Sequence, residues 1–170
     1  MLFSLNVHAQ FFNGHAGAYV GYGSVKGNSP AQSSLGFNIL FGFNHTFLSE
    51  IGLQFGYTYA RKINYFLPES TIGRYYPYVQ GFTAKAIIEQ PLGGFLFIEE
   101  GLGLSAINDR TFSDVDEWDY GIVASLYLGW NLRKLSLDGF KVGFVGESAI
   151  TFTSTTASYT MLGFRAVYYF

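Results

Sequence analysis

The sequence predicts an all-β protein, an eight-stranded antiparallel up-and-down transmembrane β-barrel, and three observations carry this prediction. Bulky apolar residues recur at every second position in segment after segment, which is the period of a β-strand. Aromatic residues make up 19% of the chain and charged residues only 13%, about half of the roughly 25% that soluble domains carry. The connections between the segments alternate between short and long, as they do in barrels that cross an outer membrane.

Eight segments show the two-residue period, and in order they are 15–25, 35–47, 51–60, 76–88, 96–104, 121–131, 140–152 and 161–170. In the clearest, 35–47, Phe37 and Phe41 lie on a bulky face opposite small or polar residues such as Asn38. One irregularity is expected in the fifth segment. Glu100 falls on the apolar face there, and a β-bulge would re-aim it or its neighbour Glu99.

The connections indicate how the barrel is oriented. Those after the second, fourth and sixth segments are short, those after the first, third and fifth are longer, and both chain ends fall at the short-turn end. Outer-membrane barrels place short turns in the periplasm and long loops outside. No linker divides the segments, so residues 10–170 are predicted to form a single barrel domain.

The distribution of bulky and small side chains over the two faces of the strands distinguishes a membrane barrel from a soluble ligand-carrying barrel. The face opposite the bulky one carries Gly, Ser, Thr, Asn and Gln rather than the charges that a water-facing surface needs. Eight strands enclose a space that side chains just fill, so the small face should point inward and the bulky face into lipid. The residues expected to face lipid are Phe37, Phe41, Phe55 and Leu126. Aromatic residues near strand ends predict girdles at the membrane interfaces, formed by Tyr57, Tyr59, Tyr76, Tyr78, Tyr120, Trp130 and Tyr168.

Residues 1–9 are predicted to be the remnant of a signal peptide. An apolar stretch ends in Val7-His8-Ala9, the small-residue pattern of a cleavage site, which makes Gln10 the first mature residue. A basic segment before it is missing, and the alternative is that residues 1–9 begin the fold. The intact mass of protein recovered from an outer membrane should match a chain that starts at Gln10. A recovered chain that still begins at Met1 would contradict the signal-peptide interpretation.

The last segment ends in alternating hydrophobic residues, Leu162, Phe164, Ala166, Tyr168 and Phe170. It is similar to the C-terminal signal that the barrel-assembly machinery reads, and the chain resembles the small outer-membrane barrels of the OmpA/OmpX type over residues 15–170. The resemblance implies the outer membrane of a Gram-negative bacterium and contact with outer-membrane lipid and lipopolysaccharide. It also implies assembly by that machinery and a protein partner that binds through the long loops.

Six charged residues fall on the predicted inward face, namely Lys85, Glu89, Glu99, Lys141, Glu147 and Arg165. A charge removed from water in a narrow lumen needs a partner. Lys85, Glu99, Glu147 and Arg165 lie near mid-strand and are expected to form one network. Arg165 is assigned to Glu147 because their strands are neighbours, with Lys85 or Lys141 as the next candidates. The resemblance favours a side-chain-filled lumen, and the alternative is a narrow channel for ions or small solutes.

Other chemistry finds little support in the residues. The chain has no Cys, so thiolate metal sites and cysteine nucleophiles are excluded, and a net charge of −2 argues against nucleic acid. An acidic run before the sixth segment lacks the register of a calcium-binding loop. It is expected to be a solvated loop, with a weak calcium site or a cation bridge to lipopolysaccharide phosphates as alternatives. This run contains Asp109, Asp114, Asp116, Glu117 and Asp119.

A lipid A-modifying enzyme would need a Ser with a His base near the outer leaflet. None of the long loops contains a His. His8 precedes the predicted cleavage point, and His15 and His45 fall near the periplasmic end. We therefore predict a non-enzymatic protein with no catalytic, cofactor or metal site, in a structural, surface-interaction or complex-subunit role.

Overall fold

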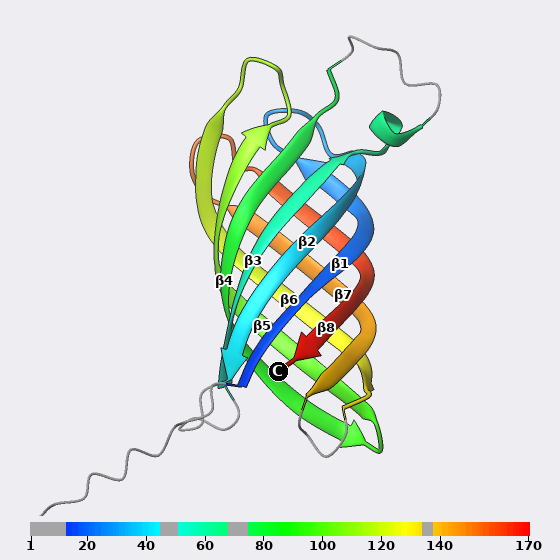
Figure 1. Ribbon diagram of the computed structural model, residues 1–170. Coiled ribbons are helices and arrows are strands. Elements are labelled where there is room, and N and C mark those ends of the chain that lie inside the picture. Colours follow the sequence, from blue (N-terminus) through cyan, green and yellow to red (C-terminus); the bar gives the residue numbers. More distant parts are fainter. Residues whose placement is uncertain (1–12, 45–50, 68–74, 134–137) are drawn as a thin grey trace, which may run out of the picture.

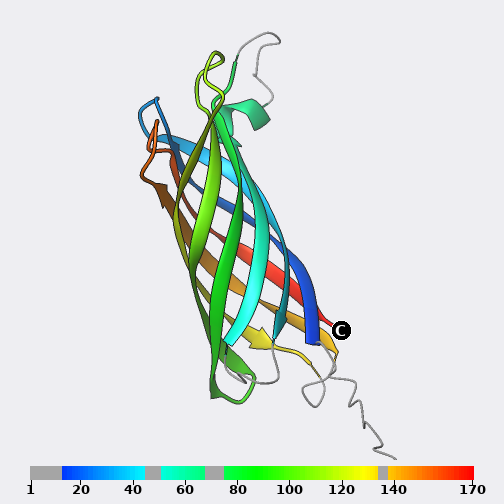
Figure 2. The ribbon, with the colours of Figure 1, turned by 90° about the vertical axis from the view of Figure 1, so that its left-hand side faces the viewer.

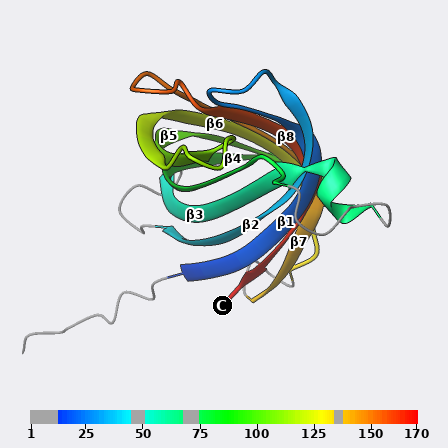
Figure 3. The same ribbon diagram turned by 90° about the horizontal axis from the view of Figure 1, so that it is seen from above.

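The computed structural model describes residues 13–44, 51–67, 75–133 and 138–170 and confirms the predicted architecture, a closed antiparallel barrel of eight strands. Each strand pairs with the next in the chain, and β8 closes the ring against β1 (Figures 1 and 3). A short 3₁₀ helix, η1 (Ile63–Phe66), follows β3. The strands are β1 (Asn13–Lys26), β2 (Gln32–Asn44), β3 (Ile51–Lys62), β4 (Tyr78–Gly93), β5 (Leu96–Arg110), β6 (Glu117–Asn131), β7 (Gly139–Thr151) and β8 (Ser158–Tyr169).

The pairing register fixes the tilt of the strands. The register can be followed from Ile51 on β3 to its partner on β4, and from there to one partner on each further strand around the ring. This path returns to β3 at Arg61, ten residues beyond its start. An offset of this size requires strands that run obliquely to the barrel axis, as Figures 1 and 2 show. The start of β1, the end of β8 and the β4–β5 turn lie at one end, and η1 and the β1–β2, β5–β6 and β7–β8 connections lie at the other (Figure 1).

The bulky face of the sheet is the outer face, as predicted. Phe41 is 50% exposed, whereas Asn38 on the same strand is 2% exposed. Phe37, Phe55 and Leu126 are also exposed on the outer wall. A surface of this composition is stable only in contact with hydrocarbon. In the described residues, no helix is long and apolar enough to cross a membrane.

Glycines explain why the inner face must be small. A Cβ added to Gly103 would lie 1.9 Å from the Ala84 carbonyl oxygen, and one added to Gly121 would lie 1.9 Å from that of Ile150. No side chain fits where neighbouring backbones approach this closely. The strongly coiled wall therefore depends on glycine at these inward positions.

Two local predictions were wrong. No bulge separates Glu99 from Glu100, because β5 pairs regularly with both neighbours there and the register shift lies at Pro91 and Gly93 instead. Glu99 is therefore in the lumen and Glu100 on the outer face, four residues from the periplasmic start of β5, where a charge costs least. The fourth strand begins at Tyr78 rather than at Tyr76, because Pro77 has no amide to donate.

Candidate functional site

An ion pair held by two tyrosines lies in the middle of the lumen. Lys85 Nζ on β4 lies 2.5 Å from Glu147 Oε2 on β7, and both side chains are almost fully buried. The hydroxyls of Tyr19 and Tyr159 each donate a hydrogen bond of 2.8 Å to Glu147 Oε1. Ser125 Oγ accepts a further hydrogen bond from Lys85 Nζ at 3.2 Å. Five strands, β1, β4, β6, β7 and β8, thus contribute side chains that meet across the bore.

A second ion pair lies nearer the periplasmic end. Arg165 Nη1 donates to Glu99 Oε1 at 2.9 Å, and both side chains are 1% exposed. The Arg165 guanidinium also stacks over the Tyr127 ring, 4.3 Å from its centroid. Below it, Lys141 pairs with Glu89 and lies against the Phe97 ring. Among the residues that the structure describes, the lumen therefore contains three ion pairs at successive levels.

The assignment of Arg165 to Glu147 was wrong, and the register shows why. Glu147 is paired across the ladder with Met161, whereas Arg165 is paired with Gly143. The two charges are thus offset by four residues, which is about 13 Å along a strand. The expected single network is divided into separate pairs, Lys85 with Glu147 and Arg165 with Glu99.

In the half of the lumen nearer the periplasmic end, which we call the lower lumen, buried polar atoms of the described residues are hydrogen-bonded less completely than in the middle. Both ring nitrogens of His15, the side-chain amide of Gln54, Glu99 Oε2, and Nε and Nη2 of Arg165 are buried without a hydrogen-bond partner among the described residues. Such groups are costly to bury dry. Polar side chains in this half of the barrel are therefore suited to contact with solvent from the periplasmic side.

Asp109 and Asp119, which were predicted to lie in an acidic loop, belong to strands. Their side chains face inward at the loop end of the barrel. β5 continues to Arg110 and β6 begins at Glu117, so Asp109 and Asp119 lie within strands and are fully buried. Their assignment to a solvated loop was wrong, because the β5–β6 ladder extends beyond the apolar segments that revealed it.

Each buried aspartate fastens an extracellular connection to the wall. Asp109 accepts hydrogen bonds from the backbone N–H of Asn28, at 3.0 Å, and from the N–H and hydroxyl of Thr111. Asp119 accepts hydrogen bonds from the hydroxyls of Thr153 and Thr155 and from the N–H groups of Thr155 and Ala157. Backbone amides held by a carboxylate preorganise the β1–β2 and β7–β8 connections.

The remaining acidic residues do not gather around a cation. Asp116 forms an ion pair with Arg110 and accepts a hydrogen bond from Asn108. Those two bonds, the one from Asn108 foremost, lower the pKa of Asp116 below its ordinary value. Asp114 and Glu117 are exposed. No group of His, Asp or Glu within the described ranges is arranged to hold a metal ion.

An Asp119→Ala variant should release the β7–β8 connection. The substitution removes the acceptor for Thr153, Thr155 and Ala157 and leaves buried donors unpaired, which costs about 1–3 kcal/mol. Limited proteolysis should cut this connection faster in the variant than in the wild type. Asp114→Ala, at an exposed position, is the matched control, and equal cleavage in both variants would show that Asp119 does not hold the connection.

Comparisons with known proteins give structural matches without sequence matches. No family model and no curated protein matches the chain. Neisserial surface protein A is similar with a TM-score of 0.62 and 9% identity, over 91% of this chain and 95% of that one. Ail, the attachment invasion locus protein of Yersinia pestis, solved with the heparin analogue sucrose octasulfate, is similar with a TM-score of 0.57 and 11% identity, over 94% and 99%. The fold is that of a small outer-membrane barrel.

Aromatic residues occur near both ends of the wall of this outer-membrane barrel. Trp130 and Tyr168 lie at the periplasmic end, where Tyr168 packs on Phe140. Tyr57, Tyr59, Tyr78 and Tyr120 lie toward the loop end, while Tyr76 precedes β4 and packs on Tyr65 of η1. The residues of the terminal motif, Leu162, Phe164, Ala166, Tyr168 and Phe170, share the outer face of the last strand and its end.

Both ring nitrogens of His15 are buried without a hydrogen-bond partner among the described residues. His15 lies inside the periplasmic end of β1 and stacks on Tyr169, with ring centroids 4.9 Å apart. His8, His45 and the predicted cleavage point lie outside the described residues. Residues that sequence reasoning missed are Tyr19 and Tyr159, the hydroxyl donors to Glu147. Their places on the inward face of β1 and β8 were the available signal.

Proposed function

We propose that the protein is a non-enzymatic resident of a Gram-negative outer membrane that acts through its extracellular rim, with a filled lumen that does not conduct. The observation that carries this proposal is the layer of Lys85, Glu147, Tyr19 and Tyr159, which spans the bore with short hydrogen bonds. An eight-stranded barrel has little more space than such side chains occupy. An ion that passed this level would have to displace a buried ion pair, which is strongly unfavourable.

The rim supports a role in surface interaction. Asp109 and Asp119 fix two extracellular connections from below, so these connections present a preorganised surface, which reduces the entropy lost on binding. Charged groups of both signs lie beside it, including Arg110 and Glu117. A protein partner bound at this surface, or a subunit role in a larger assembly, accounts for a barrel whose interior is closed.

A narrow channel for ions or small solutes is the second candidate. The unpaired polar atoms of His15, Gln54 and Arg165 in the lower lumen favour it, because polar groups without protein partners line aqueous paths in larger barrels. Planar-bilayer conductance separates the two candidates. The wild type should be silent, and a Lys85→Ala/Glu147→Ala double variant, which removes the ion pair of the central layer, should conduct. Conductance of the wild type would overturn the proposal in favour of the channel.

The surface-interaction half of the proposal needs its own test. Residues 27–31, the β1–β2 connection, can be replaced by a Gly-Ser segment of equal length while both flanking strands remain intact. Crosslinking in intact cells should then lose the partner that the wild type captures, with unfolding of the barrel nearly unchanged. A partner captured equally by both proteins would place the interaction elsewhere.

A further inference from the structure

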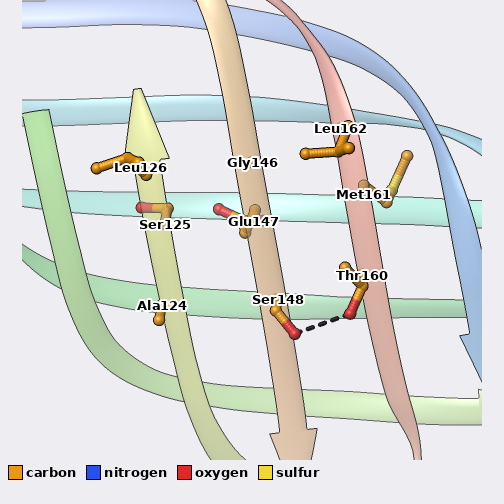
Figure 4. Close-up of a pocket in the computed structure, with 9 residues that line it drawn as sticks. All are labelled: Ala124, Ser125, Leu126, Gly146, Glu147, Ser148, Thr160, Met161 and Leu162. Atoms are coloured by element: carbon orange, nitrogen blue, oxygen red, sulfur yellow. Dashed lines mark hydrogen bonds between the residues drawn. The ribbon is translucent and has the colours of Figure 1, made fainter. Parts of the chain in front are cut away.

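The outer wall contains a hollow of about 290 Å³ over β6, β7 and β8. Its outward-facing lining is formed by Ala124, Leu126, Gly146, Ser148, Thr160 and Leu162 (Figure 4). Gly146 forms its floor, and a Cβ added there would meet only the Leu162 side chain, at 3.1 Å. A larger side chain could therefore occupy the hollow without disturbing the backbone. We call this feature the wall hollow.

The wall hollow contains two hydroxyl groups on a wall that is mostly apolar. Ser148 Oγ and Thr160 Oγ1 lie 2.8 Å apart and share a hydrogen bond at an exposed position (Figure 4). Only one proton joins the two oxygens, so the pair keeps a second hydroxyl hydrogen and further lone pairs for another partner. A polar pair at this depth favours a ligand that can hydrogen-bond to it.

The register places a cation above the wall hollow. Gly146 belongs to the row that contains Leu162 and Tyr22, and the next row toward the loops joins Ser148 and Thr160 to Ser24. One row further, Lys26 is paired with Ser158. Lys26 ends β1 on the same outward face as Ser24, about 7 Å further along the strand. Its side chain is exposed and makes no ion pair with any described residue.

We propose that the wall hollow and Lys26 together bind one phosphorylated lipid of the outer leaflet. An acyl chain lies over Gly146 between Leu126 and Leu162. The Ser148 and Thr160 hydroxyls meet the ester or hydroxyl groups where that chain joins the headgroup, and the Lys26 ammonium meets the phosphate. The deeper, apolar part of the site then binds the acyl chain, and the cation nearer the membrane surface binds the headgroup of the same molecule.

A lipid fits this site better than a second copy of the chain. A hollow of this volume lies near the lower end of the range for small-molecule pockets, about 300–1,000 Å³. A stable protein interface instead needs about 800 Å² from each partner. The hollow also lies on the outer face of the barrel, which is the face in contact with the hydrocarbon of the membrane.

Lipid retention measured by native mass spectrometry tests the proposal. Purified protein in detergent is titrated with diphosphoryl lipid A, and with phosphatidylcholine as the zwitterionic comparison. We expect one lipid A to be retained. Gly146→Leu should weaken its binding about tenfold, because the added side chain takes the space of about two methylenes. Lys26→Gln should weaken it about fivefold, as expected for one cation near a membrane surface.

Two matched variants complete the test. Ala84→Leu adds comparable bulk, one carbon less, on the outer face of β4, away from the wall hollow, and Lys62→Gln removes another rim lysine. Neither should change lipid A retention. Equal losses in these variants, or retention unaffected by Gly146→Leu, would overturn the proposal. If Gly146→Leu instead converts a dimer into a monomer with retention unchanged, the hollow is an interface between copies and the proposal is wrong.

These outcomes are independent of the proposed rim function, because conductance and partner crosslinking involve neither the wall hollow nor Lys26. A silent barrel that retains no lipid A would overturn only the lipid site. A conducting barrel that retains lipid A would overturn only the closed lumen.

Discussion

A Lys85→Met variant should have a free energy of unfolding about 3–5 kcal/mol below that of the wild type, the usual cost of breaking a buried ion pair. The substitution leaves the Glu147 carboxylate with its tyrosine donors but without a counter-charge in a lumen that offers little water. Glu147→Gln should produce a loss of similar size, because the ammonium of Lys85 then has no anionic partner. Urea unfolding from lipid vesicles measures both.

The double variant decides which charges are partners. Lys85→Met/Glu147→Gln removes both charges and should cost clearly less than the sum of the single changes, as expected for residues in contact. The same cycle on Arg165 and Glu99 should also be non-additive, since these atoms lie 2.9 Å apart. A cycle on Arg165 and Glu147 should be additive within about 0.5 kcal/mol. Strong coupling in that last cycle would contradict the observed pairing.

Phe41→Arg should lower the free energy of unfolding by about 2–4 kcal/mol, because the substitution places a cation on the lipid face of the wall. Phe41 is half exposed there and is paired with Phe55 of β3. Its neighbour on the other face, Asn38, donates a hydrogen bond of 2.7 Å to Thr58 Oγ1. Asn38→Ala should cost only about 1 kcal/mol for that bond.

Unfolding from lipid vesicles measures the loss of stability in both variants. The larger loss identifies the face of the wall that meets lipid. If Asn38→Ala proves more damaging than Phe41→Arg, the bulky face does not meet lipid and the barrel is inside out. The charge-neutral variant Phe41→Leu is the control for lost aromatic packing and should behave nearly as the wild type.

The fold was predictable because every level of the sequence agrees. The two-residue period, the small inward face and the alternating connections each indicate the same barrel, and an error of one residue would turn every side chain to the wrong face. Which residues face inward could therefore be predicted for Lys85, Glu99, Glu147 and Arg165. Which of them meet could not, because pairing depends on register across strands that are distant in sequence.

Strand ends were predicted less well than strand centres. Asp109 and Asp119 continue a ladder after the apolar pattern has ended, so composition alone assigned them to a loop. Their role as acceptors for the connections depends on where Asn28 and Thr155 come to lie. The wall hollow has the same origin. Nothing in the sequence pattern distinguishes Gly146 and Ala124 from their neighbours in two separate strands. The pairing register brings them together beside Thr160.

Cysteine accessibility along β2 tests the central claim, a barrel with lipid outside and packed side chains within. The chain has no native Cys, so single-cysteine variants at residues 37 to 41 report one position each. In vesicles, Cys at 37, 39 and 41 should react with a lipid-soluble thiol reagent and not with a water-soluble one. Cys at 38 and 40 should resist both reagents. Modification of 38 or 40 by the water-soluble reagent would show an open aqueous lumen and contradict the account.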